Sequence, residues 1–279
     1  MLINGEAVRA PIKVHKLRGN VAVLEGSGGN VAVPTGEEGK LLVGAGIAVS
    51  RPQVLTALDD LGGAPITHLI NTHWHFDHAA GNAWVNQEGA ETLAHENKRK
   101  QLLVTQRVDD WSHGFLAPPP NALPKQVFST EHEVRLNGST LALKYYGPAH
   151  TDSDISVRFV EADILHAGDT FWNGIYPFID YSTGGHIDGT IAAAETNLAS
   201  TTDQTIIIPG HGAPVGSRAQ LRDLHDMLVD IRSNVATLKR QGLSLEAIVA
   251  ARPTAAHYAR WGQFVIDPHL FTRLVHEGV

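Results

Sequence analysis

The chain has 279 residues and no cysteine. This absence excludes disulfide bonds, thiolate metal ligands and a cysteine nucleophile, but it says little about the redox compartment. No apolar run approaches the roughly 18 residues that cross a membrane, so the sequence predicts no membrane span. The first residues show no basic stretch followed by an apolar one, so we expect no secretory signal and a cytoplasmic protein.

Positive charge is also scarce. Lys and Arg number 22 against 29 Asp and Glu, which gives a net charge of -7. The largest basic cluster is the short run 98–100, so nucleic acid is not an expected partner. A hydrophobic content of 43% is enough for a sizeable core. No linker or repeat divides the chain, and we therefore expect a single domain over 1–279.

One stretch concentrates side chains that bind metals. Residues 71–78 read Asn-Thr-His-Trp-His-Phe-Asp-His. The β-branched and apolar run 66–70 before it predicts a buried strand, and the small residues from 79 to 82 look like the start of a helix. The sequence therefore predicts that the motif lies in a loop between a strand and a helix, where side chains can converge.

The spacing within this motif indicates two metal sites. In an extended loop His73 and His75 point the same way and can bind one metal ion. Asp77 and His78 follow where the chain turns, and can face a second ion. Imidazole and carboxylate ligands suit zinc, with iron or manganese as alternatives.

Three more candidate ligands each follow an apolar run. His150 lies in the segment Gly-Pro-Ala-His-Thr-Asp, Asp169 in His-Ala-Gly-Asp-Thr, and His211 in Pro-Gly-His-Gly. With the motif at 73–78, this order of landmarks resembles the metallo-β-lactamase superfamily, and the resemblance covers almost the whole chain. It implies an α/β (α+β) fold, a four-layer αββα sandwich, and a metal-dependent hydrolase.

The resemblance also implies roles for the candidate residues. The first zinc ion would be held by His73, His75 and His150, the second by Asp77, His78 and His211, and Asp169 would bridge the two. A hydroxide between two zinc ions per chain would attack the carbonyl group of a small-molecule substrate, and Asp77 would orient the hydroxide and accept its proton. Esters, lactones and thioesters fit, whereas an acid at 169 argues for weak β-lactam cleavage at best.

One segment departs from the family pattern. Gly44-Ala45-Gly46 stands where relatives commonly place an Asp that orients an active-site histidine. Either another group replaces that Asp, or one metal ion is held less firmly. A mononuclear iron enzyme resembling persulfide dioxygenases therefore stands as an alternative. A phosphodiesterase of the same fold is a further alternative, which the negative net charge disfavours. Nothing in the sequence sets the oligomeric state.

Other segments carry weaker expectations. A helix is expected over 96–106, followed over 107–127 by an irregular, aromatic-rich loop at the mouth of the site or on the plain surface. Aromatic residues over 171–178 are candidates for a pocket wall or for core packing. His95 and His186 could approach the site but match no ligand position. Ser217 and Gln220 predict a capping box at the start of a long, core-packed helix.

Overall fold

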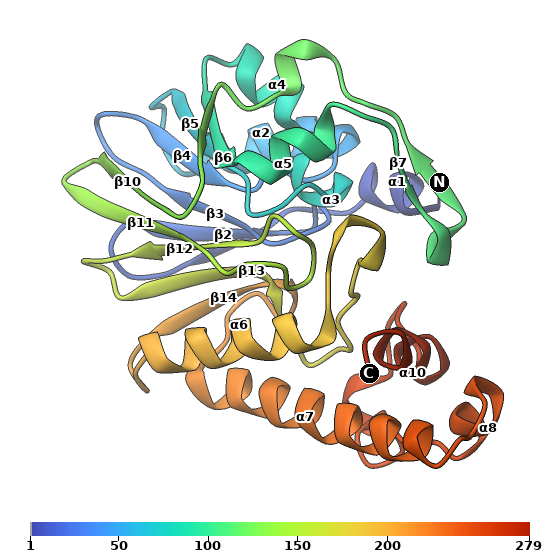
Figure 1. Ribbon diagram of the computed structural model, residues 1–279. Helices are drawn as coiled ribbons and strands as arrows, with labels where there is room; N and C mark the ends of the chain where they lie inside the picture. The colour runs from blue at the N-terminus through green and yellow to red at the C-terminus, as the bar shows by residue number, and fades with distance from the viewer. Residues whose placement is uncertain (1) are drawn as a thin grey trace.

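In the computed structural model, which describes residues 2–279, two β-sheets pack face to face between two layers of helices (Figure 1). Short β-branched runs separated by glycine-rich turns form the strands, because alternate apolar side chains can then be buried on both faces of each sheet. This arrangement confirms the four-layer αββα sandwich that the sequence predicts.

The first sheet has seven strands in the order β1-β2-β3-β4-β5-β6-β9. Its strands are β1 (Lys13–Lys16), β2 (Val21–Glu25), β3 (Val31–Pro34), β4 (Lys40–Val43), β5 (Ile66–Ile70), β6 (Glu91–His95) and β9 (Gln126–Phe128). Strands β1 to β4 pair antiparallel, whereas β4, β5, β6 and β9 run parallel. The parallel strands end at one edge, so the loop after β5 opens where a site can form.

The second sheet has five strands in the order β10 to β14. These are β10 (Glu131–Leu136), β11 (Ser139–Tyr145), β12 (Ile155–Phe159), β13 (Ile164–Asn173) and β14 (Ile206–Gly212). The hairpin between β10 and β11 turns at Asn137 and Gly138, whose φ angles of 55° and 68° explain the Asn-Gly pair. The last two strands pair parallel and carry Asp169 and His211.

Helices cover the outer face of each sheet (Figure 1). The helices over residues 2–279 are α1 (Leu2–Ala7), α2 (Arg51–Asp59), α3 (Phe76–Ala79), α4 (Asn82–Gln87), α5 (Glu96–Leu102), α6 (Ile187–Ser200), α7 (Arg218–Arg240), α8 (Leu245–Ala250), α9 (Tyr258–Trp261) and α10 (Pro268–Glu277). The capping box of Ser217 and Gln220 at the start of α7 is confirmed. Over residues 2–279, no helix is both long and apolar enough to cross a membrane.

Three apolar clusters fill the spaces between these layers. The cluster between the sheets contains Val23, Leu41 and Leu143. A second cluster joins the first sheet to α2 and α4, and the third joins the second sheet to α6, α7 and α10. Burial of this apolar surface, at about 25 cal/mol per Å², is the main force holding the ligand-bearing strand ends in place.

Three local predictions need correction. The helix expected over 96–106 ends at Leu102, and the loop expected over 107–127 contains a hairpin of β7 (Gln106–Val108) and β8 (His113–Phe115). These strands have three residues each and turn through Ser112 at φ 48°, without the Asn-Gly signal that would have marked a hairpin. Helix α3 begins at Phe76, inside the metal-ligand motif and not after it.

Candidate metal centre

All seven side chains that the sequence predicts as metal ligands converge from the two sheets. They form two groups, in each of which one ligand atom per residue lies within 4.8 Å of the others. The first group contains His73, His75, His150 and Asp169, and the second contains Asp77, His78 and His211. The turn into α3 explains the division, because it redirects Asp77 and His78 away from the direction of His73 and His75.

Asp169 lies between the two groups. Its Oδ1 is 3.0 Å from Nε2 of His78, and its Oδ2 is 3.3 Å from Nε2 of His211. Its Oδ2 is also 3.4 Å from Nε2 of His150, in the other group. One carboxylate thus reaches imidazole nitrogens of both groups, which is the position that a ligand shared by two ions would need.

Several of these buried atoms have no hydrogen-bond partner in the described part of the chain. They include both carboxylate oxygens of Asp169 and Nε2 of His73. An unsatisfied buried polar group costs about 1–3 kcal/mol, and a charged one costs more. A cation would satisfy these atoms, and an imidazole and carboxylate donor set without thiolates suits zinc, iron or manganese. The residues present therefore fit a metal centre.

Outer partners fix the ring orientation of two histidines in the first group. Nε2 of His75 donates to Oδ2 of Asp180 at 3.0 Å, which directs Nδ1 of His75 toward Nε2 of His150 at 2.9 Å. Nδ1 of His150 donates to the carbonyl oxygen of Phe178 at 2.7 Å. Partners of this kind set the tautomer that a metal-binding imidazole needs. Sequence reasoning missed Asp180, although its side chain is buried beside a ligand.

Burial sets the charge of His73 and His150 in the first group. It lowers the pKa of His73 well below its usual value despite the nearby Asp169. Burial likewise lowers the pKa of His150 to about 4. Both imidazoles are therefore neutral at pH 7, and the neutral form is the one that binds a metal ion.

The second group differs from the first in two ways: two carboxylates lie beside His211, and two of its side chains are partly exposed to solvent. Burial lowers the pKa of His211, but Asp169 and Asp77 outweigh it and raise the value to about 10. Burial raises the pKa of Asp77, yet His78 and His211 lower it to about 2. The side chains of Asp77 and His211 are 13% and 12% exposed, whereas those of the first group are almost fully buried. Solvent therefore reaches the centre on the side of these two residues.

The segment Gly44-Ala45-Gly46 holds the loop of the second group through its backbone. The amide of Ala45 donates to the carbonyl oxygen of His78 at 2.7 Å, and the amide of Gly81 donates to that of Gly46 at 3.0 Å. Nδ1 of His78 is nevertheless buried without a hydrogen-bond partner among the described residues. The ring of His78 instead packs directly against Gly29. The approach is so close that a Cβ atom on Gly29 would overlap the ring.

A buried lysine supports the same loop from behind. Lys98 is fully buried, and its Nζ donates to Oδ1 of Asn71. Nδ2 of Asn71 in turn donates to Oδ1 of Asn82 at 3.0 Å and to the carbonyl oxygen of His78 at 3.3 Å. Burial lowers the pKa of Lys98 well below its usual value. The run 98–100 is therefore not a uniformly solvated face, since Lys98 points inward.

Aromatic rings surround the first group. The ring of Trp111, on the turn between β7 and β8, lies 5.6 Å from that of His75 and 4.7 Å from that of Phe178. The aromatic residues of 171–178 are all buried in the core, and Trp172 lies 4.3 Å from His211. His95 stacks on Tyr145 and caps α5, and His186 caps α6, so neither belongs to the two groups.

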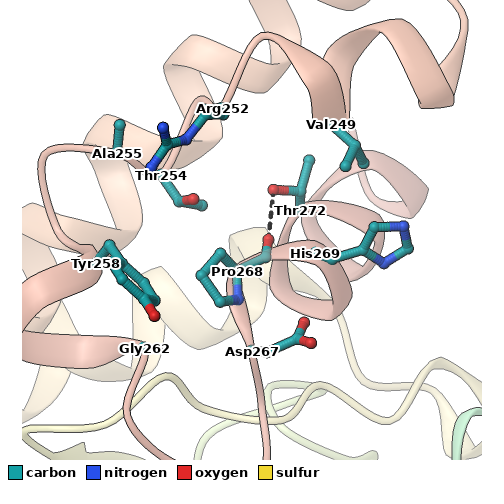
Figure 2. A pocket seen from close by; sticks show the side chains of 10 residues that line it. All are labelled: Val249, Arg252, Thr254, Ala255, Tyr258, Gly262, Asp267, Pro268, His269 and Thr272. Carbon is teal, nitrogen blue, oxygen red and sulfur yellow. Dashed lines mark hydrogen bonds between the residues drawn. The ribbon is translucent and has the colours of Figure 1, made fainter.

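Several cavities in the described part of the chain lie outside the ligand groups, and two of them bear on function. One, of about 460 Å³, is an open pocket among the C-terminal helices, and Figure 2 shows its polar side chains Arg252 and Asp267 on opposite sides. The one hydrogen bond drawn there joins Thr272 to the carbonyl of Pro268 within α10, so the polar groups do not converge on a ligand. The other cavity, of about 480 Å³, lies under the β7–β8 hairpin and is lined in part by Phe76, next to His75 and Asp77.

Comparison with known proteins agrees with this geometry. Residues 24–234 match the family described as the metallo-beta-lactamase superfamily. A hydroxyacylglutathione hydrolase of Rhodospirillum rubrum is 26% identical over 72% of this chain and 67% of its own length. A hydroxyacylglutathione hydrolase from Polaromonas sp. is 30% identical over 53% of this chain. The match spans only about half (49%) of the length of that relative.

Solved structures extend the likeness in fold. The DIM-1 metallo-beta-lactamase superposes with a TM-score of 0.61 at 19% identity, covering 78% of this chain and 97% of that one. The metallo-beta-lactamase of Pontibacter korlensis gives 0.63 at 18% identity, with coverage of 78% and 99%. The family match covers most of the chain and includes all seven candidate ligands, and the chain therefore belongs to the metallo-beta-lactamase superfamily.

Proposed function

We propose that this protein is a metal-dependent hydrolase that holds two zinc ions and cleaves a small substrate at a carbonyl group. The observation that carries the proposal is the position of Asp169, whose unsatisfied oxygens face both ligand groups. His73, His75 and His150 would hold one ion, Asp77, His78 and His211 the other, and Asp169 both. When bound, zinc lowers the pKa of a coordinated water from 15.7 to about 7 and polarises a carbonyl oxygen.

The chain's own residues prepare this chemistry. Asp180 and the carbonyl of Phe178 orient the imidazoles of His75 and His150. Asp77 is ionised at neutral pH, because its pKa is lowered to about 2, and it lies at the exposed side of the centre. Its carboxylate can therefore accept a hydrogen bond from the attacking water and orient it toward the substrate. The buried aromatic rings behind the first group exclude bulk water.

The names of the relatives favour one bond type. Two of them are hydroxyacylglutathione hydrolases, so an ester or thioester is a better candidate substrate class than a β-lactam. The structures with β-lactamase titles are under 25% identical and support the fold alone.

Metal content and turnover test the proposal together. Elemental mass spectrometry on protein purified without chelator should give about two zinc ions per chain, and the protein should hydrolyse a panel of esters, lactones and thioesters. His75→Ala should abolish turnover in a chain that stays folded, whereas His132→Ala, at an exposed position on β10, should not. A content of one iron ion per chain, together with oxygen consumption when a persulfide is added, would refute the hydrolase and support the dioxygenase alternative.

A further inference from the structure

The cavity under the β7–β8 hairpin is lined mainly by apolar side chains, with Gln101, Gln106 and His113 as its polar ones. Its volume is about 480 Å³, within the range of small-molecule sites. Helix α3 contributes Phe76 and Ala79, helix α5 contributes Leu102, and the hairpin contributes Phe115. No lysine, arginine, aspartate or glutamate is found among the described residues that line it. A charged group placed here would lose its hydration without gaining a partner.

This cavity is joined to the metal centre by a chain of aromatic contacts. The rings of Phe76 and Phe115 are stacked, with centroids 5.1 Å apart. Trp111 lies 6.3 Å from Phe76 and 5.6 Å from His75. Phe76 also precedes Asp77, which is at the solvent-accessible side of the centre. A substrate with its carbonyl group at the centre would therefore have to extend only across Phe76 to enter the cavity.

The rim of the cavity leaves apolar side chains in contact with water. Leu116 is 82% exposed and Val104 is 56% exposed, and both line the cavity. Neighbouring apolar residues with this degree of exposure typically mark a binding surface. An apolar group in the cavity would remove their surface from water, at about 0.8 kcal/mol for each methylene buried.

We propose that this cavity binds the acyl chain of the substrate, and that the preferred substrates are esters or thioesters of uncharged, apolar acyl groups. This proposal rests on the proposed hydrolase function. Water adds across the scissile bond: its oxygen forms the new bond to the acyl carbon, and the C–O or C–S bond breaks. One proton goes to the leaving alcohol or thiol, and the acyl group leaves as a carboxylic acid. The charged glutathione portion of a thioester would lie outside this cavity.

A series of p-nitrophenyl esters from acetate to octanoate tests the proposal. The kcat/KM should rise about three- to fourfold per added methylene, the factor that corresponds to burial of one methylene group. Ala80→Trp should fill the cavity from an exposed position directly after α3 and lower the octanoate-to-acetate ratio of kcat/KM at least tenfold. Leu116→Glu should lower the same ratio by placing a charge at the rim. Val265→Trp, at a 65% exposed site outside the cavity, is the matched control and should leave the ratio unchanged.

A binding measurement separates this proposal from the proposed function. Octanamide should bind the wild type in calorimetry, acetamide should not, and Leu116→Glu should weaken octanamide binding. Octanamide binding without turnover of any ester would refute the hydrolase and leave the cavity assignment standing. Hydrolysis of acetate with an unchanged octanoate-to-acetate ratio in both cavity variants would refute the assignment and leave the hydrolase standing.

Discussion

Nε2 of His75 and Oδ2 of Asp180 lie 3.0 Å apart, although 105 residues separate them in the chain. The same carboxylate accepts from Oγ1 of Thr183 at 2.7 Å, and Thr183 in turn accepts from Nε1 of Trp74 at 2.9 Å. Asp180 thus contacts the loop of candidate ligands at two neighbouring residues, directly at His75 and through Thr183 at Trp74. Its position fixes which nitrogen of His75 faces the other ligands.

Replacing Asp180 should therefore weaken the centre without removing a ligand. Asp180→Asn keeps the shape of the side chain but loses the charge that holds the Nε2–H of His75. We expect a ten- to hundredfold loss in metal affinity or activity, the effect typical of such outer partners. Metal titration and kcat on the same preparation would measure it. Asp188→Asn, which breaks an exposed ion pair with Arg232, is the control. Wild-type affinity and activity in Asp180→Asn would contradict the positioning role.

The candidate ligands could be predicted from the sequence, but the residues that support them could not. The candidates at 73, 75, 150 and 211 stand out because histidines at strand ends follow clear apolar runs. Asp180 lies in an irregular segment with no periodic pattern, and only the folded chain brings it to His75. Lys98 likewise sits in a run that looks solvated, and its burial depends on how α5 packs against Asn71.

The fold shows the same division. Strands of five or more residues and the long helix α7 were predictable because their apolar periodicity is local. The β7–β8 hairpin was not, since strands of three residues carry almost no pattern and Ser112 makes an unmarked left-handed turn. Of the two positions that the sequence left open for this segment, the structure places Trp111 at the site, 5.6 Å from the ring of His75.

The close approach of Gly29 to His78 leads to a second prediction. Gly29→Ala would place a methyl group against the imidazole, so the β2–β3 loop or the ring must move. Overpacking of this kind costs about 1–3 kcal/mol. We expect a lower melting temperature and reduced occupancy of the second metal position. Gly63→Ala has open space around the new methyl group and should change neither. Equal metal content in the two variants would show that the β2–β3 loop moves to make room for the methyl group and that the ring of His78 stays in place.

Removal of metal should destabilise the protein as well as inactivate it. The two groups place Asp77 and Asp169 beside five buried or nearly buried imidazoles, and the oxygens of Asp169 have no other partners among the described residues. An ion that binds only the folded state stabilises it by about 2.7 kcal/mol at a hundredfold excess over its Kd. Differential scanning calorimetry with and without chelator should show a lower melting temperature that added zinc restores. An unchanged melting temperature would argue against a tightly bound metal.

Lys98 predicts a specific dependence of stability on pH. Burial lowers its pKa in the folded protein well below the ordinary 10.5, so the unfolded chain binds more protons between the two values. Stability contributed through Lys98 must therefore rise with pH, by at most about 1.4 kcal/mol per unit, until the pH reaches the unfolded pKa. Lys98→Met removes this dependence. The unfolding free energy of the variant should therefore exceed that of the wild type most near neutral pH, and the difference should shrink toward pH 10. The upper boundary is set by the pKa of the lysine in the unfolded chain, about 10.5. Urea unfolding across that range, with the solvent-exposed Lys100→Met as the control, measures the difference. A pH-independent gap between wild type and Lys98→Met would mean that Lys98 stays charged in the folded state, where Asn71 alone would have to stabilise the ammonium.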